Sequence, residues 1–394
     1  MSRSRKSWAG TCLAVAVAGG VTVGLVPGTA VAAQGAPSLQ VIAGKLNNPR
    51  GITVLGDGTI LVAESGTGGK GPCVGSGEGR QCFGATGSVY RVKGAKKGRV
   101  VTGLPSVGGP GEAIGPVDVA VSGKDYIVLN GFGGGTAQRA KFGSKARRMG
   151  TLYRVRGGKI YGDLVAHETR LDPDWVLPRT DPGEPSVNAN PWRFASAAGG
   201  VYVTDAGGND LLRVSGGKTY TEAIFPHNEI APAPKTAAAS PQARQLLRAI
   251  AGPGEAVQGG IPVQSVPTGV VKGPDGALYV GELGGFAPGA SRIWRIVPGH
   301  RPKVFASGLT AVADLALDGR GNLVALTMTT GFGQNGPQPG ALYRINLKTK
   351  AKSEIPTGGK LLFPTGLGVG PKGQIYVANN GIGSGAGQLV RVRA

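Results

Sequence analysis

Three charged side chains that could perform chemistry occupy equivalent positions in a segment that recurs along the chain. Asp118, Arg193 and Asp314 are each the third residue of such a segment, which usually opens with proline. If the segments meet around a common axis, two carboxylates and a guanidinium lie close together. Carboxylate oxygens are the ligands that a hard divalent cation such as Ca²⁺ prefers, whereas an arginine among aspartates would neutralise them as ion pairs. Both interpretations are open, and the ion pair is favoured.

A second set of polar residues ends another recurring segment, which is rich in β-branched and apolar residues. Its members are Glu64, Asn130, Asp205, Glu282, Thr327 and Asn379. Such side chains either accept hydrogen bonds from neighbouring turns or line a ligand site. In the cation interpretation, Glu282 completes a metal-ligand set with Asp118 and Asp314, and Ca²⁺ is the candidate cofactor. Arg193 and the adjoining Trp192 join these three as candidate ligand-binding residues.

Other patterns that would indicate catalysis are missing from the sequence. The three histidines, His167, His227 and His300, fall in different connecting segments without metal-ligand spacing. No Gly-x-Ser-x-Gly elbow opens a helix after a strand, and no phosphate-binding glycine loop with its lysine occurs. No catalytic residue is therefore assigned, and the sequence leaves open whether the protein is an enzyme.

One segment concentrates positive charge. The candidate contacts for a polyanion surround Phe142, and they are Arg139, Lys141, Lys145, Arg147 and Arg148. No acidic residue occurs from Gly131 to Gly150, and the whole chain has a formal charge of +21. Such a protein attracts polyanions, for example wall polymers or lipid headgroups, and a merely solvated loop is the alternative. The sequence lacks the signatures of specific nucleic-acid binding.

The elements that position these residues come from six copies of a strand that contains arginine. The copies are Ser88–Val92, Thr151–Val155, Asp210–Val214, Ile293–Ile296, Ala341–Ile345 and Gln388–Val392. Before each copy lies one of the β-rich runs, and before that run lies the segment that usually opens with proline. Turns such as Gly56–Gly58 join the first two strands. The repetition predicts an all-β protein, a six-bladed β-propeller of four-stranded antiparallel blades.

Ring closure and loop placement follow from the same repeat. The last copy lacks a fourth strand, and we predict that Leu39–Leu46 supplies it by pairing with the last blade. Insertions between second and third strands and insertions between blades should emerge at one end of the ring, beside the inner-strand starts. We expect this insert-rich face to carry the function, because rigid scaffolds position functional loops. One helix is expected at Pro241–Ala251.

The N-terminal residues have the pattern of a secretion signal. Arg3, Arg5 and Lys6 precede an apolar run, and small residues follow at Ala30–Ala33. We therefore expect a signal peptide over residues 1–33, one propeller domain over residues 34–394 and an extracellular location, with a retained membrane anchor as the alternative.

Cysteine content agrees with that location. Removal of the signal would take Cys12 and leave two cysteines, Cys73 and Cys82, on either side of one glycine-rich loop. In an oxidising compartment these two should form a disulfide. The loop they close contains too much glycine to become ordered by itself.

The arrangement resembles the six-bladed propellers of the NHL-repeat, gluconolactonase and strictosidine-synthase-like superfamily. Val201–Asn209 is similar to an NHL strand and turn, and the glycine-rich inserts and Asn48–Ile52 make the chain similar to the ScyD/ScyE family of secreted bacterial propellers. That family implies no settled reaction. Lactonases of the superfamily place charged cation ligands at the inner-strand starts. The corresponding positions in this chain lack charged cation ligands. They hold Arg50, Val117, Trp192, Thr268, Ala313 and Thr365.

We therefore expect a secreted, monomeric propeller that binds a small molecule or an extracellular protein on its insert-rich face. One alternative is a metal-dependent lactonase or hydrolase of the gluconolactonase-like type. The other is a protein held to an anionic cell-wall polymer by its charge.

Overall fold

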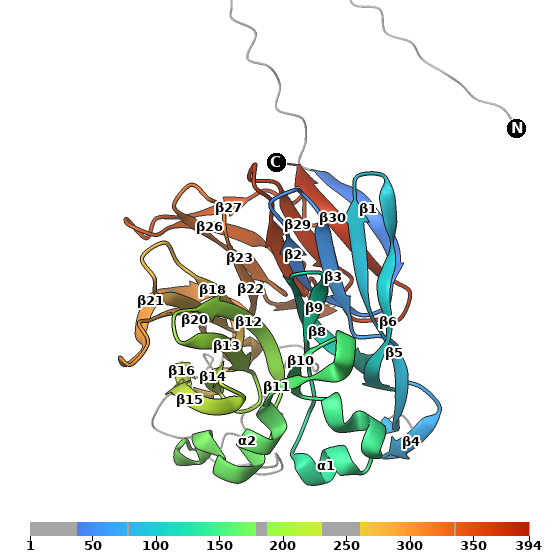
Figure 1. Cartoon of the computed structure of the whole chain (residues 1–394). Coiled ribbons are helices and arrows are strands. Elements are labelled where there is room, and N and C mark those ends of the chain that lie inside the picture. Colours follow the sequence, from blue (N-terminus) through green and yellow to red (C-terminus); the bar gives the residue numbers. More distant parts are fainter. Residues whose placement is uncertain are drawn as a thin grey trace, which may run out of the picture. The chain divides into compact units, whose positions relative to one another are not determined.

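Six sheets arranged as a β-propeller make up the computed structural model of the chain (Figure 1). The structure describes residues 38–76, 79–109, 111–178, 187–230, 261–334 and 336–393. The expected signal peptide and the expected helix at Pro241–Ala251 lie outside the described residues. All described residues belong to one compact unit.

Each blade is a four-stranded antiparallel sheet whose strands follow the predicted repeat. Blade 1 contains β2 (Pro49–Val54), β3 (Ile60–Glu64), β5 (Gln81–Lys93) and β6 (Lys96–Gly108). Blade 2 contains β8 (Pro116–Ser122), β9 (Asp125–Asn130), β10 (Thr151–Arg154) and β11 (Ile160–Asp163). Blade 3 contains β12 (Pro191–Ala197), β13 (Gly200–Asp205), β14 (Asp210–Ser215) and β15 (Lys218–Ile224).

The second half of the ring repeats this order. Blade 4 contains β18 (Pro267–Lys272), β19 (Leu278–Glu282), β20 (Ser291–Ile296) and β21 (Lys303–Leu309). Blade 5 contains β22 (Val312–Leu317), β23 (Asn322–Thr327), β26 (Leu342–Asn346) and β27 (Lys352–Ile355). Blade 6 contains β28 (Gly366–Val369), β29 (Ile375–Asn379), β30 (Gly387–Arg393) and β1 (Ser38–Leu46). The predicted fold class is confirmed.

Shorter elements lie in the connections. The short strands are β4 (Gly71–Val74), β7 (Ala113–Ile114), β16 (Asn228–Ile230), β17 (Ile261–Val263), β24 (Phe332–Gly333) and β25 (Gly336–Pro337). The α-helices are α1 (Thr136–Ala140) and α2 (Leu164–Leu171), which lie side by side (Figure 1). The 3₁₀ turns are η2 (Ser144–Arg148), η3 (Arg156–Gly158), η4 (Pro173–Val176) and η5 (Gly284–Phe286).

The first described strand closes the ring. β1 pairs antiparallel with β30, and the register places Leu39 opposite Val392 and Val41 opposite Val390. In Figure 1 the blue β1 therefore lies beside the red β30. The predicted closure is confirmed, and it removes the exposed edge that the last sheet would otherwise present.

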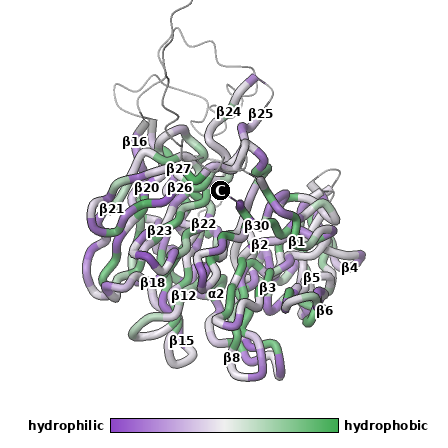
Figure 2. Tube along the Cα trace, turned by 90° about the horizontal axis from the view of Figure 1, so that it is seen from above, coloured by the Kyte–Doolittle hydropathy of each residue, from purple (hydrophilic) through white to green (hydrophobic). Residues whose placement is uncertain are grey.

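The hydrophobic core lies between neighbouring blades. Tyr202 and Leu211 of blade 3, for example, pack with Leu278, Val280 and Trp294 of blade 4. Hydrophobic stretches of the chain coincide with the blade strands, whereas hydrophilic stretches are frequent in the connections (Figure 2). The second strands are apolar on both faces because a blade lies on each side of them.

The four ion pairs of the repeated arginines occur within blades. Arg154 pairs with Asp125 at 2.8 Å, Arg295 with Asp275 at 2.8 Å and Arg344 with Asp318 at 3.2 Å. Arg213 pairs with Glu222 at 3.1 Å. These contacts agree with a structural role for the repeated arginine, and each contributes little because the groups are partly solvated.

The connections that follow the second strands and the connections that lead into the inner strands meet at one end of the ring, as predicted. The amide of Ser65, after β3, donates to the carbonyl of Asn48, before β2, at 3.0 Å. The same contact recurs from Leu283 to Val266 at 2.9 Å in blade 4. Among the described residues, no helix is long and apolar enough to cross a membrane.

Removal of β1 should open the ring. A chain that begins after Leu46 would expose β30 and lose the buried Leu46, whose removal alone costs about 2–5 kcal/mol. We expect its thermal unfolding, followed by circular dichroism, to occur at a lower temperature and over a broader range. A chain that begins at Ser38 is the matched control and should unfold as cooperatively as the full chain. Equal cooperativity of the two shortened chains would refute closure as a source of stability.

Candidate functional site

The insert-rich end of the axis is crossed by a buried arginine. Arg193, at the start of inner strand β12, donates from Nε to Asp314 Oδ2 at 3.0 Å and from Nη1 to the carbonyl of Val117 at 2.9 Å. The other Nη donates to the carbonyl of Thr365, and the side chain is 4% exposed. One guanidinium of blade 3 thus holds atoms of blades 2, 5 and 6.

Close packing around the axis requires glycine in the blades between the charged residues. A Cβ at Gly51 would lie 2.5 Å from Asp118 Oδ1, and a Cβ at Gly366 would lie 1.9 Å from the carbonyl oxygen of Arg50. The Arg50 guanidinium is also buried, and it donates to the carbonyls of Gly381 and Ala113. Burial lowers the pKa of Arg50 to about 10, against the attraction of a nearby glutamate, so the side chain stays charged at neutral pH.

Within the described part of the chain, Asp118 accepts hydrogen bonds only from backbone amides. Oδ1 accepts from Val119 N at 2.9 Å and Oδ2 from Phe194 N at 3.0 Å. Burial raises the pKa of its carboxyl to about 7; Arg193 and these amides oppose the rise, and Asp314 adds to it. Asp118 therefore changes charge near neutral pH.

These contacts favour the ion-pair interpretation of the axis over the cation interpretation. Oδ2 of Asp314 is engaged by Arg193 and by Leu367 N, and Asp118 already accepts two amides. Glu282 is occupied within its own blade, because Ser265 Oγ, Arg292 and Trp294 Nε1 donate to it. The carboxylate oxygens of Glu282, Asp118 and Asp314 do not all lie within 4.8 Å of one another, so these three described residues do not form a metal-ligand group.

Trp192 lies beside the axial cluster. Its ring centroid is 5.4 Å from Arg193 Cζ, and its Nε1 donates to the carbonyl of Ala313 at 3.2 Å. The ring is half-buried and packs against Leu283 and Met328. The structure thus brings four of the five candidate residues, all except Glu282, to one end of the axis.

The basic insert of blade 2 is anchored by apolar side chains. Phe142, Ala146 and Met149 are buried in a cluster with Phe83 of blade 1. The Phe132 and Phe142 rings meet edge to face with centroids 6.2 Å apart. Because these residues point inward, Lys141, Lys145 and Arg147 on the same segment point to solvent.

One of the five predicted cations is already neutralised. Arg139 forms two 2.8 Å hydrogen bonds with the carboxylate of Asp163, and its side chain is only 12% exposed. Asp163 follows the insert and also caps α2 by accepting from Ala166 N at 2.9 Å. The predicted contact set therefore lacks a free Arg139. The sequence did not indicate this pairing, because Asp163 lies beyond the acid-free segment.

Three of the other four cations, all except Lys141, border a pocket between blades 1 and 2. The pocket has a volume of about 440 Å³. Its lining consists of Phe83, Ala85, Gly103, Pro105, Ser144, Lys145, Arg147 and Arg148, with no acidic residue among them. Arg148 Cζ lies 5.4 Å from the ring centroid of Tyr153, and its buried Nε has no hydrogen-bond partner among the described residues. One wall is apolar and the other offers N–H donors.

The predicted disulfide supports that pocket. Cys73 on β4 is bonded to Cys82 on β5, so the prediction is confirmed. Phe83 follows Cys82 directly and lines the pocket. A Cβ at Gly143 would lie 3.4 Å from Pro72 Cγ, which shows that the inserts of blades 1 and 2 touch. The covalent bond thus orders a glycine-rich wall.

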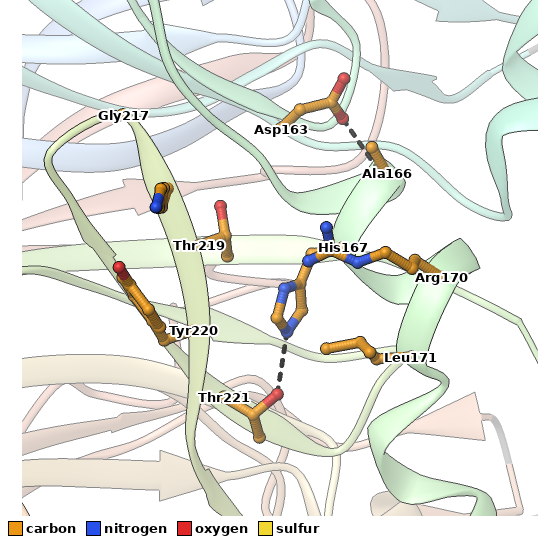
Figure 3. Close-up of a pocket in the computed structure, with 10 residues that line it drawn as sticks. Asp163, Ala166, His167, Arg170, Leu171, Gly217, Thr219, Tyr220 and Thr221 are labelled. Atoms are coloured by element: carbon orange, nitrogen blue, oxygen red, sulfur yellow. Dashed lines mark hydrogen bonds between the residues drawn. The ribbon is translucent and has the colours of Figure 1, made fainter.

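A second pocket, of about 640 Å³, lies between α2 and β15. Figure 3 shows His167 extending from α2 toward Thr221, with Nε2 and Oγ1 2.8 Å apart. Burial, together with the charge of Arg170, lowers the pKa of the imidazole, which is therefore neutral at pH 7. Asp163 at the edge of this pocket is engaged by Arg139 and Ala166. The histidine joins α2 to blade 3, and we assign it no catalytic role.

Substitution of the axial arginine should destabilise the fold. Arg193→Ala leaves Asp314 buried without its partner, and breaking a buried ion pair costs about 3–5 kcal/mol. Arg193→Lys should recover only part of this, because an ammonium cannot reach several acceptors in a plane. Urea unfolding measures the change. Wild-type stability in Arg193→Ala would show that the axial contacts do not hold the blades.

The pKa of Asp118 predicts a specific pH dependence. Because the folded protein raises this pKa to about 7, the fold favours the protonated carboxyl. The resulting contribution to stability is full below about pH 4, the pKa of an aspartate in the unfolded chain, and is lost as the pH rises through about 7. Asp118→Asn does not titrate, so wild type should lose stability relative to this variant over that range. Urea unfolding from pH 4 to 8 tests this, and parallel profiles would contradict it.

Comparison with known proteins adds information on the fold alone. Neither protein-family models nor curated protein sequences give a match. Among solved structures, a putative oxidoreductase (glucose dehydrogenase) from Thermus thermophilus has a TM-score of 0.50 at 18% identity, covering 90% of this chain and 99% of that chain. A protein of unknown function from Bacteroides thetaiotaomicron has a TM-score of 0.51 at 11% identity, covering 91% and 76%.

A putative gluconolactonase is also similar, with a TM-score of 0.45 at 10% identity, covering 91% of this chain and 92% of that chain. At such identities the likeness to solved structures shows the fold only. The finer resemblance to the ScyD/ScyE family stays a prediction.

Proposed function

We propose that the protein is an extracellular binding protein that holds an anionic cell-wall polymer at the pocket between blades 1 and 2. The observation that carries this proposal is that Lys145, Arg147 and Arg148 all line one pocket whose described lining contains no acid. An anion entering it meets donors from η2 on one side and apolar β5 and β6 atoms on the other.

The chemistry of the lining suits a phosphate or carboxylate group on a larger chain. Arginine donates in a planar fork that matches two oxygens of such a group. Phe83 and Pro105 offer apolar surface to the carbon skeleton beside the charge. The pocket is open to solvent through the exposed Lys145 and Arg147, so a polymer can pass across it without threading.

Two further observations support an extracellular location. The Cys73–Cys82 disulfide is typical of oxidising compartments, and the first 33 residues have the pattern of a secretion signal. The proposal includes no reaction. The lactonase alternative gains no support from the axis, where Arg193 and backbone amides engage the aspartates.

Removal of two exposed cations should weaken wall binding selectively. A double variant with Lys145→Gln and Arg147→Gln keeps Arg139 paired and removes two charges from the pocket. At roughly 1 kcal/mol per cation near an anionic surface, affinity should fall by roughly 10- to 30-fold. Co-sedimentation with purified cell wall at low salt measures this change.

The matched control is Arg301→Gln with Lys303→Gln, two exposed cations at the same spacing in and before β21. This control should retain most of the binding. An equal loss of wall affinity in both double variants would show that net charge alone is responsible. Unchanged affinity in both would show that the pocket does not bind the wall. Binding should also weaken with salt, because the Debye length falls from about 10 Å at 0.1 M to about 3 Å at 1 M.

A further inference from the structure

Five carboxylates gather where α2 ends against blade 3, away from the axis and from the basic pocket. Glu168, Asp172 and Asp174 offer oxygens that all lie within 4.8 Å of one another. Glu168 is on the last turn of α2, Asp172 is its C-cap and Asp174 lies in η4. Negative charge at a helix C-terminus is unfavourable because the helix dipole is negative there. The chain nevertheless places three acids at this end.

The other two carboxylates face each other across a tight hairpin. Asp205 ends β13 and Asp210 begins β14, and the two residues are directly paired in the sheet register. Side chains at such positions lie on one face, where like charges repel. Both residues are completely buried. The two Oδ atoms of Asp210 and Oδ2 of Asp205 have no hydrogen-bond partner in the described part of the chain.

The two groups form one cluster. Asn209, in the hairpin turn, donates from Nδ2 to Asp174 Oδ2 at 2.9 Å. A Cβ at Gly208 in the same turn would lie 3.0 Å from Glu168 Oε2 and 3.7 Å from Asp205 Cγ. The acids at the end of α2 therefore lie directly against the hairpin that carries the two buried aspartates.

Electrostatics agrees with this geometry. Burial raises the pKa of Asp210 well above its usual range, and Asp205, Glu168 and Asp174 add to the rise in that order. Burial, followed by the charges of Asp205 and Asp174, raises the pKa of Glu168 to about 8. Over the ranges that the structure describes, none of the ion pairs involves these five residues. The cluster thus contains crowded carboxylates and buried oxygens without donors.

We propose that Glu168, Asp172 and Asp174 bind a Ca²⁺ ion, with Asp205 and Asp210 forming the inner wall of the site. A divalent cation would give a partner to Asp172 Oδ1, a buried oxygen with no hydrogen-bond partner in the described part of the chain, and would offset the repulsion across the hairpin. Ca²⁺ fits best because the cluster is made of oxygens, and Ca²⁺ accepts six to eight oxygen ligands in flexible geometry. Zinc would need nitrogen or sulfur ligands, and Mg²⁺ demands stricter octahedral geometry.

The bound ion would join α2 and η4 to blade 3. These elements belong to the connection from blade 2 to blade 3, whose described residues contribute no strand to either sheet. Ca²⁺ is thereby a local structural ligand of the insert-rich end. The inference does not depend on the proposed wall binding, because the basic pocket uses none of these residues.

The first experiment is a Ca²⁺ titration of the full mature protein after treatment with EDTA. Binding to the folded state alone should raise the melting temperature of a domain of this size by roughly 3–4 °C at about 100 times the dissociation constant. Glu168→Gln should weaken the affinity by about 10- to 100-fold or more, since even the outer partners of metal ligands contribute that much. Asp210→Asn should reduce the Ca²⁺ response while the melting temperature in EDTA stays equal or rises, because repulsion is removed.

The matched control is Asp118→Asn, which also neutralises a buried aspartate but at the axis. It should keep the Ca²⁺ response. If Asp118→Asn abolishes the response and Glu168→Gln does not, the ion binds at the axis and the inference is wrong. A wild-type melting temperature that Ca²⁺ leaves unchanged would equally overturn it, and would show that the carboxylates share protons instead.

Terbium luminescence locates the ion even if a carboxylate variant fails to fold. Tb³⁺ replaces Ca²⁺ in oxygen sites and emits when a nearby tryptophan transfers energy to it. Trp175 adjoins Asp174 and is 72% exposed, so Trp175→Phe should abolish the sensitised emission while Ca²⁺ still raises the melting temperature. Emission that persists in Trp175→Phe, or that Ca²⁺ does not displace in wild type, would place the ion elsewhere and refute the site.

Discussion

The guanidinium of Arg193 donates hydrogen bonds to atoms of four blades, and the inner strands are positioned around it. A propeller axis brings six strand starts together, where unpaired carbonyls would otherwise be buried without donors. Arg193 and Arg50 supply those donors, and Asp314 balances part of their charge. Glycine at the equivalent position in blades 1, 4 and 6 leaves room for these side chains. The axis is thus a packed polar core, and binding chemistry has to lie in the loops around it.

Positive and negative charges gather in different loops, and α2 lies between the two groups. At the N-terminal end of the helix, Asp163 binds Arg139 and so fixes the basic insert of blade 2. At the other end, Glu168 and Asp172 join the acidic cluster on blade 3. The eight-residue helix thus separates the basic insert from the acidic cluster. A net positive protein can therefore present a cationic pocket and a separate anionic site on one framework.

Most of the fold could be predicted because the same strand pattern occurs six times in the sequence. The arginine strand, the β-rich run and the segment that usually opens with proline each matched observed strands, and β1 completed blade 6 as expected. The candidate site was harder. Asp118, Arg193 and Asp314 do meet at the axis, but Glu282 belongs to a network within blade 4. Glu282 ends a second strand, whereas Asp118, Arg193 and Asp314 lie at the starts of inner strands, and its side chain is bonded within the blade instead of reaching the axis.

Local sequence patterns are enough to encode strand order, blade number, the cysteine pair and the clustering of cations in one insert. Which of the charges are free depends on contacts between segments that are distant in the chain. Arg139 pairs with Asp163 beyond its own insert, and Glu168 of α2 lies near Asp205 and Asp210 of blade 3. Such partners are set by loop paths, which carry no periodic signal. Burial and neighbouring charge, rather than residue type, decide whether a carboxylate is an ion-pair partner or an unsatisfied ligand.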